Sequence, residues 1–241
     1  MNVKIEQSKL YGCVTIPASK SFAHRILLAA ALCGESTTVK GKLLGDDIFA
    51  TIACLEKIGA HFWETNENEL LVTPSSFSKQ NKYKFNAQES GSTLRFLLPV
   101  VAALGLTATF LGEGRLNERP IAELVEVLCQ HGIISSGKSL PVTISGELRA
   151  GEYVINGDIS SQYITGLLFA LPLLDGDSTI EIVGDMVSLS YIDVTLAVLK
   201  SFGISIVRAR NIFIVKGKQS YTSSNFIEVE GDWSSAGFFA V

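Results

Sequence analysis

The sequence predicts an α/β fold, an inside-out α/β barrel of three βαβαββ repeats with the helices central and the sheets outside. Three observations favour this class. A short motif of small polar residues recurs at a nearly constant interval. The run after each copy is apolar around nearly its whole circumference, which is typical of a buried helix. Strand-like runs alternate in polarity instead, as strands do in a sheet with one face in water.

The recurring motif sets the length of the repeat. Its copies begin at Ser19, Ser90, Ser160 and Ser234, at intervals of 71, 70 and 74 residues. Amphipathic segments end in step with it, at Gly59, Gly132 and Gly203. Glycine after the last apolar residue is a common helix stop, so each unit is predicted to hold two helices. With the strand-like runs, each unit reads strand, helix, strand, helix, strand, strand. Three units are complete, and a fourth begins at Glu230.

The first helix of each unit is expected in the middle of the fold. The segments concerned are 26–32, 96–104 and 164–171, which are almost wholly apolar. A helix without a polar face is stable only when other elements surround it. The run 82–86 instead reads Lys-Tyr-Lys-Phe-Asn, an alternation that suits an outer sheet.

Composition indicates a substantial core and argues against several kinds of partner. The 241 residues are 47% hydrophobic, and 20 basic and 24 acidic side chains give a net charge of −4. No overall positive field is present to attract nucleic acid or an anionic membrane. The longest apolar stretch, 96–111, is shorter than the ~20 residues of a membrane-spanning helix. The amino terminus lacks the pattern of a secretory leader, so a cytoplasmic protein is expected.

The cysteines and histidines do not suggest a metal site. The four cysteines, at positions 13, 33, 54 and 129, form no C-x-x-C pair, and the three histidines are scattered. We therefore expect buried reduced thiols rather than a metal site or a disulfide framework.

Basic residues stand near predicted helix starts, where acidic ones are usual. Lys20 and Arg25 flank one start, Arg95 lies in the first turn of another, and Arg119 precedes Pro120, a residue favoured at the first helical position. A cation opposes the helix dipole unless an anion lies between them, so these positions predict a phosphate or carboxylate site. The alternative is that they are solvated surface charges.

The motifs taken together resemble those of the 5-enolpyruvylshikimate-3-phosphate synthases. Four match in order and approximate spacing: Pro17-Ala18-Ser19-Lys20-Ser21-x-x-x-Arg25, Ser90-Gly91-Ser92-Thr93-Leu94-Arg95, Asn117-Glu118-Arg119-Pro120-Ile121 and Gly157-x-x-Ser160-Ser161-Gln162-Tyr163. The match continues through 188–193 and 231–236, so the resemblance covers nearly the whole chain.

The resemblance implies an enolpyruvyl transferase fold and a defined reaction. The family transfers the enolpyruvyl group of phosphoenolpyruvate to the 5-hydroxyl of shikimate 3-phosphate and releases phosphate, a step of chorismate and aromatic amino acid biosynthesis. No organic cofactor and no metal are implied. Residues implied to bind shikimate 3-phosphate are Lys20, Ser21, Arg25, Ser160, Ser161, Gln162, Ser188 and Tyr191. Those implied to contact phosphoenolpyruvate are Lys20, Gly91, Arg119 and Gln162. Lys20 is the implied catalytic residue, with a general-acid role as a hypothesis.

The resemblance also implies that this chain is an amino-terminal half. Family members have two such barrels, and the carboxylates assigned to proton transfer lie in the other half. We expect residues 18–228 to form the complete first barrel, and 1–17 and 229–241 to be fragments of an otherwise absent carboxy-terminal barrel. The chain stops within an apolar run at 238–241. It is therefore expected to bind substrate without turnover.

Two other functions remain open from the residues. One is a half of the UDP-N-acetylglucosamine enolpyruvyl transferase, although that enzyme usually has Lys-Asn where this chain has Lys20-Ser21, and a reactive cysteine where it reads 112–116. The other is a non-catalytic module that binds phosphometabolites. Such a module has no reason to prefer shikimate 3-phosphate over simple phosphate.

Overall fold

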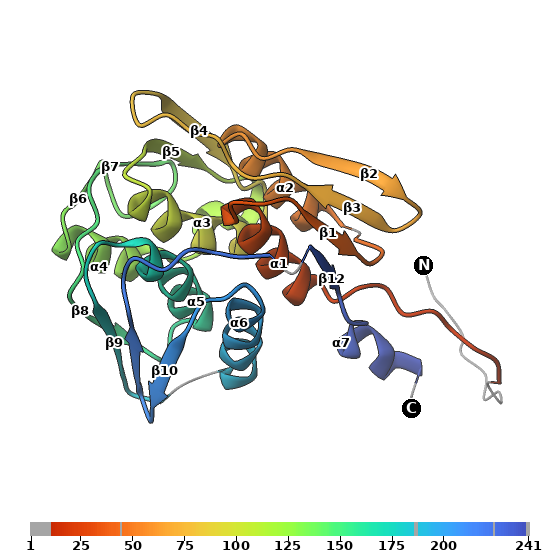
Figure 1. Cartoon of the computed structure of the whole chain (residues 1–241). Helices are drawn as coiled ribbons and strands as arrows, with labels where there is room; N and C mark the ends of the chain where they lie inside the picture. The colour runs from red at the N-terminus through yellow and green to blue at the C-terminus, as the bar shows by residue number, and fades with distance from the viewer. Residues whose placement is uncertain (1–10, 44, 186–187, 224, 240–241) are drawn as a thin grey trace.

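Three four-stranded sheets enclose a set of central helices in the computed structural model, which describes residues 11–43, 45–185, 188–223 and 225–239 (Figure 1). The second unit contains β4 (Lys82–Asn86), α3 (Gly91–Ala103), β5 (Thr107–Leu111), α4 (Ala122–Gln130), β6 (Ile133–Ser135) and β7 (Val142–Gly146). The third contains β8 (Glu152–Asn156), α5 (Ser161–Ala170), β9 (Ser178–Val183), α6 (Leu189–Ser201), β10 (Ile206–Ala209) and β11 (Ile212–Val215). The predicted order of elements is confirmed in both units.

The first unit takes one strand from the far end of the described chain. It contains α1 (Lys20–Leu32), β1 (Thr37–Lys40), α2 (Asp46–Lys57), β2 (Phe62–Asn66), β3 (Glu69–Val72) and β12 (Phe226–Glu228). Strand β12 pairs in parallel with β1, Val39 opposite Ile227, as β4 does with β5 and β8 with β9. All three sheets therefore have the same strand arrangement, and α7 (Trp233–Ala236) follows outside them.

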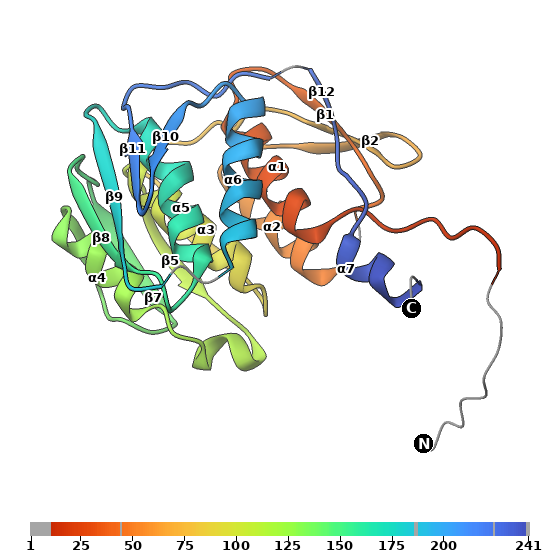
Figure 2. The same ribbon diagram turned by 90° about the horizontal axis from the view of Figure 1, so that it is seen from below.

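The first helices of the units are buried, as the sequence predicts. Every residue of α3 from Thr93 to Ala102 is buried, and α1 and α5 are similarly enclosed. Helices α3 and α5 approach closely at Gly166, where an added Cβ would lie 2.3 Å from the carbonyl oxygen of Arg95. Figure 2 shows α1, α3, α5 and α6 side by side within the sheets. Packing of apolar helix surfaces thus provides the shared core.

The helix stops and the alternating strands are also confirmed. Gly59, Gly132 and Gly203 follow the ends of α2, α4 and α6 with φ of 87°, 100° and 76°. This left-handed conformation is the one that favours glycine at a helix end. In β4 the alternation places Phe85 in the core and exposes Lys82 and Lys84.

Two details of the sequence interpretation are wrong. The thiols of Cys33 and Cys54 are buried and free, but Cys13 and Cys129, although free, are exposed. Pro120 is not the first residue of a helix, because α4 begins at Ala122 with Ile121 as its N-cap. The preceding 3₁₀ turn, η1 (Gly114–Glu118), has Arg119 as its C-cap, and Pro120 lies in the short loop between η1 and α4.

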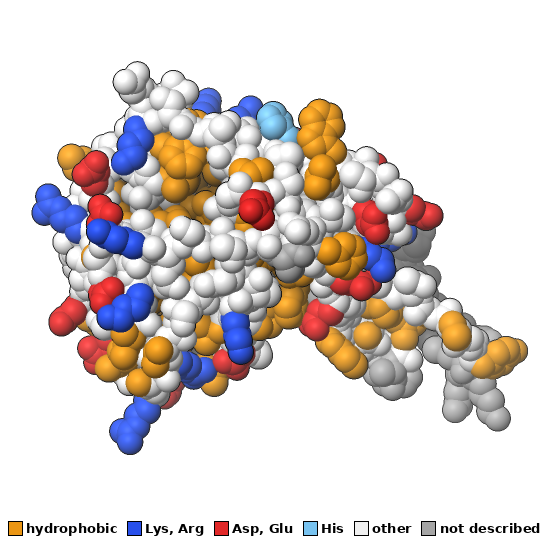
Figure 3. Space-filling model, viewed as in Figure 1, with side chains coloured by type: hydrophobic (Ala, Val, Ile, Leu, Met, Phe, Trp, Pro, Cys, Tyr) orange, Lys and Arg blue, Asp and Glu red, His pale blue; other side chains and the backbone are white. Residues whose placement is uncertain are grey.

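The surface mixes both signs of charge. Lys and Arg side chains are interspersed with Asp and Glu over the face shown in Figure 3, with no continuous basic area there. Across the described ranges, no helix has the length and apolar character needed to cross a membrane. Within the same ranges, no group of three or more His, Cys, Asp or Glu side chains is arranged to hold a metal ion.

Candidate active site

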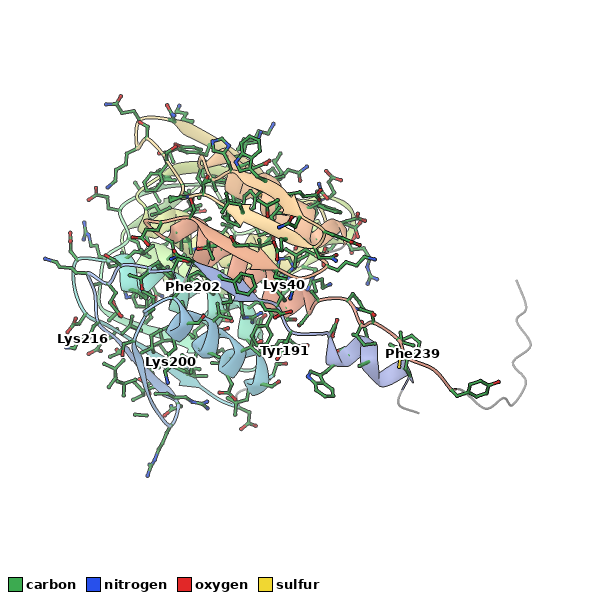
Figure 4. All side chains as sticks on the ribbon, turned by 45° about the vertical axis from the view of Figure 1, so that its right-hand side comes forward. Lys40, Tyr191, Lys200, Phe202, Lys216 and Phe239 are labelled. Carbon is green, nitrogen blue, oxygen red and sulfur yellow. The ribbon has the colours of Figure 1, made fainter. Side chains whose placement is uncertain are left out.

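A pocket of about 570 Å³ lies where the amino-terminal ends of α1, α3, α5 and α6 converge. Every site residue implied by the sequence lines it: Lys20, Ser21, Arg25, Gly91, Arg119, Ser160, Ser161, Gln162, Ser188 and Tyr191. The fold thus brings together residues that are up to 171 positions apart, from Lys20 to Tyr191. Figure 4 labels Tyr191 on the end of α6 beside α1.

Serines begin the helices around the pocket, but they do not all act as caps. The hydroxyl oxygens of Ser19, Ser90 and Ser160 accept hydrogen bonds from backbone N–H groups in the first turns of α1, α3 and α5. Ser188, which precedes α6, has a left-handed backbone (φ 58°), and its side chain caps no N–H of that helix. This side chain is exposed and lines the pocket, so its hydroxyl is available to a ligand.

Arg25 is a buried cation held by neutral oxygens. Its side chain is 3% exposed and donates to Thr195 Oγ1 (2.8 Å) and to the backbone oxygens of Ser21 (2.7 Å) and Tyr191 (3.1 Å). Its guanidinium also lies 5.0 Å from the ring centroid of Phe96. Burial lowers the pKa of Arg25 to about 10, so the group is still charged at neutral pH. No carboxylate neutralises this charge in the described ranges, which leaves it available to an anion.

Gln162 is fixed between two neighbours from α3. Arg95 Nη1 donates to Gln162 Oε1 at 2.6 Å, and Gln162 Nε2 donates to Ser92 Oγ at 3.0 Å. Arg95 is itself 4% exposed, and burial lowers its pKa. Arg25 and Arg95 are both buried, so the alternative that these two residues are solvated surface charges is wrong.

Arg119 lies directly over the start of α3. A Cβ added at Gly91 would lie 2.6 Å from Arg119 Nη1, so a larger residue there would require the guanidinium to move away from the start of α3. The side chain of Arg119 is exposed on the pocket wall. A planar guanidinium above helix N–H groups is suited to bind a phosphate or carboxylate.

Lys20 has a partner that the sequence interpretation missed. Its Nζ lies 2.8 Å from Asp47 Oδ2, in the first turn of α2, and both side chains are partly exposed. This pair could not be predicted from the sequence, because acidic residues in the first turn of a helix are ordinary. An incoming anion must therefore share or replace the contact between Lys20 and Asp47.

A buried chain of side chains fixes Asp47. His24 Nδ1 lies 2.7 Å from Thr51 Oγ1, which lies 2.7 Å from Thr93 Oγ1, and the backbone oxygen of Asp47 is 3.3 Å and 3.4 Å from these two hydroxyls and can accept from one of them. Burial is the main cause that lowers the pKa of His24 from 6.5 to about 4, so this ring is neutral at pH 7. The network therefore ties α1, α2 and α3 together just behind Lys20.

The charges of the pocket favour a small polyanion. Lys20, Arg25, Arg95 and Arg119 line it, against two carboxylates, Asp47 and Glu89. Several converging cations with short hydroxyl and backbone donors are suited to a ligand that carries phosphate and carboxylate groups.

Comparison with known proteins decides the family. Residues 5–241 match the family described as EPSP synthase (3-phosphoshikimate 1-carboxyvinyltransferase). The chain belongs to the EPSP synthase family. It is 42% identical over 243 residues to the 3-phosphoshikimate 1-carboxyvinyltransferase of Clostridium kluyveri, which covers 99% of this chain and 56% of that protein. It is 43% identical over 249 residues to the enzyme of the same name from Clostridium beijerinckii, covering 99% and 57%.

Solved EPSP synthase structures share the fold. That of Acinetobacter baumannii superposes with a TM-score of 0.81 at 23% identity, covering 95% of this chain and 52% of that one. The likeness confirms the inside-out α/β fold of the enolpyruvyl transferase type. The chain spans about half the length of the curated relatives it matches.

Proposed function

We propose that this chain carries the shikimate 3-phosphate side of a 3-phosphoshikimate 1-carboxyvinyltransferase. In the reaction, the 5-hydroxyl of shikimate 3-phosphate loses its proton as its oxygen bonds to C2 of phosphoenolpyruvate, and C3 gains a proton, which gives a tetrahedral intermediate. The bond from C2 to the phosphate oxygen then breaks, C3 loses a proton to restore the double bond, and inorganic phosphate leaves. The observation that carries the proposal is the single pocket lined by all ten implied site residues.

The family resemblance divides these residues into two groups. Arg25, Ser160, Ser161 and Ser188, with Ser21 and Tyr191, would hold shikimate 3-phosphate, and Gly91 with Arg119 would hold phosphoenolpyruvate. Lys20 and Gln162, which line the same pocket, would contact both substrates. Because negative charge develops where the substrates meet, the ammonium of Lys20 would stabilise it, and it is our candidate general acid.

The rest of the active site would come from a carboxy-terminal barrel. We propose that 18–228 is the first barrel and that 1–17 and 229–241 belong to the second, residues 1–10 and 240–241 being outside the described ranges. The side chains of Trp233 and Phe238 are 81% and 85% exposed, as expected of surfaces that a second barrel would cover. Figure 4 shows the nearby Phe239 away from the sheets. Without that barrel we expect binding but no turnover, in a cytoplasmic setting.

Ligand-dependent unfolding tests the proposal. A ligand that binds only the native state stabilises it by RT ln(1 + [L]/Kd), about 2.7 kcal/mol at ~100 times Kd. We expect shikimate 3-phosphate to raise the Tm of the purified chain, and an equal concentration of inorganic phosphate to raise it much less. Arg25→Ala should abolish the difference, whereas Lys200→Ala, on the outer part of α6, should keep it.

Two outcomes would contradict the proposal. Equal stabilisation by both ligands would favour a general phosphometabolite-binding module. Measurable formation of enolpyruvyl product by the purified chain alone would refute the expectation that it binds without turnover.

A further inference from the structure

We propose that Arg95 and Tyr163 are positioning residues: together they fix the Pro120 carbonyl, and with it Arg119, while Arg95 also sets the direction of the Gln162 amide. This inference rests on the proposed function and deepens it. Neither residue is among those that the family resemblance assigns to a substrate, although Arg95 lines the pocket. Both lie just behind the two side chains that would do so.

The Pro120 carbonyl is the point at which the Arg119 loop is held. It accepts hydrogen bonds from Arg95 Nη2 at 3.0 Å and from Tyr163 Oη at 2.6 Å. Proline has no N–H, so this oxygen is the only hydrogen-bonding group that its backbone offers. One donor comes from α3 and the other from α5, so the loop is tied to both central helices at once.

The position of Arg119 follows from this attachment. Its peptide bond leads directly into Pro120, and its backbone N–H donates to Leu116 O within the 3₁₀ turn. Gly91 provides the space that lets the guanidinium lie close to the start of α3. Displacement of the Pro120 carbonyl would therefore move Arg119 off the N–H groups of that helix.

Arg95 also decides which end of the Gln162 amide faces the pocket. A guanidinium only donates hydrogen bonds, so the atom 2.6 Å from Arg95 Nη1 must be the amide oxygen. The NH₂ group then points to Ser92 Oγ, and its second hydrogen remains for a ligand. An amide turned the other way would present an oxygen to an anion and repel it.

Because Arg95 and Tyr163 are buried, their hydrogen bonds require a guanidinium at position 95. The side chain of Tyr163 is fully buried, and Arg95 Cζ lies 5.6 Å from its ring centroid. Arg95 Nε has no partner among the described residues, and no carboxylate there pairs with the guanidinium. A lysine at position 95 would keep the charge, but one ammonium cannot reproduce the planar geometry that joins Gln162 to Pro120.

The test combines NMR and calorimetry on the whole chain, with three variants. Tyr163→Phe removes only the hydroxyl, and we expect the Arg119 Nε–Hε signal to shift and broaden while affinity for shikimate 3-phosphate changes less than about twofold. Arg95→Lys should perturb the Gln162 side-chain amide signals and weaken shikimate 3-phosphate binding about fivefold to tenfold, as for the loss of one ordinary hydrogen bond. Gln162→Glu keeps the contact with Arg95, so it should fold normally yet lose at least as much affinity.

Tyr153→Phe is the matched control. Tyr153 is also fully buried, and its hydroxyl donates to the carbonyl of Arg149 at 2.5 Å, away from the pocket. Its loss should lower Tm by an amount similar to Tyr163→Phe and leave the Arg119 signal unchanged. This comparison separates positioning from general support of the fold.

The outcomes distinguish failure of the positioning role of Arg95 and Tyr163 from failure of the proposed function. An Arg119 signal that is the same in Tyr163→Phe as in the wild type overturns the inference, and so does Arg95→Lys with unchanged Gln162 signals and affinity. Failure of the wild-type chain to prefer shikimate 3-phosphate over phosphate would refute the proposed function. The ligand-free NMR signals would still decide whether Arg95 and Tyr163 fix these side chains.

Discussion

Lys20 and Asp47 form an ion pair at the mouth of a pocket whose other charges are mostly positive. Partly exposed pairs of this kind contribute little to stability, because water screens them. Their effect on a charged ligand is larger, since the carboxylate opposes any anion that approaches the ammonium. We therefore expect Asp47 to lower the affinity of the site for phosphate.

Neutralising Asp47 should strengthen anion binding. We expect Asp47→Asn to tighten binding of inorganic phosphate about fivefold, since one unit charge at close range in water contributes about 1 kcal/mol. Calorimetric titration at low salt measures the change. Asp177→Asn, which breaks the similar surface pair with Lys216, is the control and should have no effect. Weaker binding in Asp47→Asn would mean that the carboxylate serves mainly to hold Lys20 in place.

His24 should make stability depend on pH. Its pKa falls from 6.5 in the unfolded chain to about 4 in the folded one, so the unfolded state binds the proton more readily. The stability is fully present above pH 6.5 and is lost as the pH falls toward 4, by roughly 3 kcal/mol over that range at 1.36 kcal/mol per pKa unit.

Urea unfolding between pH 7 and pH 4.5 measures this dependence. In His24→Gln, whose amide can still meet Thr51, the free energy of unfolding should fall less steeply with pH than in the wild type. His61→Gln alters an exposed histidine and should follow the wild-type curve. Parallel curves for wild type and His24→Gln would exclude a neutral buried ring.

The elements of the fold were largely readable from local patterns. Apolar helices and the glycines that end helices are patterns of residues close together in the sequence, so the inside location of α1, α3 and α5 could be predicted. Contacts between residues far apart in the sequence could not be predicted from such local patterns. The start of α4 after Pro120 and the attachment of that proline to Arg95 and Tyr163 depend on how α3 and α5 pack.

The packing of α3 against α5 depends on one glycine. A Cβ at Gly166 would meet the Arg95 carbonyl at 2.3 Å and a ring carbon of Pro99 at 2.9 Å. We expect Gly166→Ala to lower the free energy of unfolding by about 1–3 kcal/mol, the usual cost of overpacking, despite the better helix propensity of alanine. Gly34→Ala, with no atom within 4 Å of the added Cβ, is the control for urea unfolding. An equal effect of the two substitutions would show that α3 and α5 can separate without cost.

The closure of the first sheet is a property of the entire chain. Strand β12 fills the place that β4 and β8 take in the other sheets, although it follows β1 by almost 190 residues. The three residues of β12 contain no pattern that indicates which strand they pair with, so the pairing with β1 could not be predicted from the sequence. Nearby backbone bonds, from Ser19 N to Glu230 O and from Asp232 N to Pro17 O, hold the two connecting segments together.

Shortening the chain tests the proposed domain boundary. A chain of residues 17–232 keeps β12 and both connecting segments, so we expect it to unfold cooperatively and to bind shikimate 3-phosphate like the full chain. A chain of residues 17–223 lacks β12 and uncovers Val39, which is fully buried, together with the edge of β1. It should lose about 3 kcal/mol or more, from buried apolar area and unpaired strand groups. Denaturant unfolding compares the two, and equal stability would show that the barrel is complete before residue 224 and that β12 only rests against it.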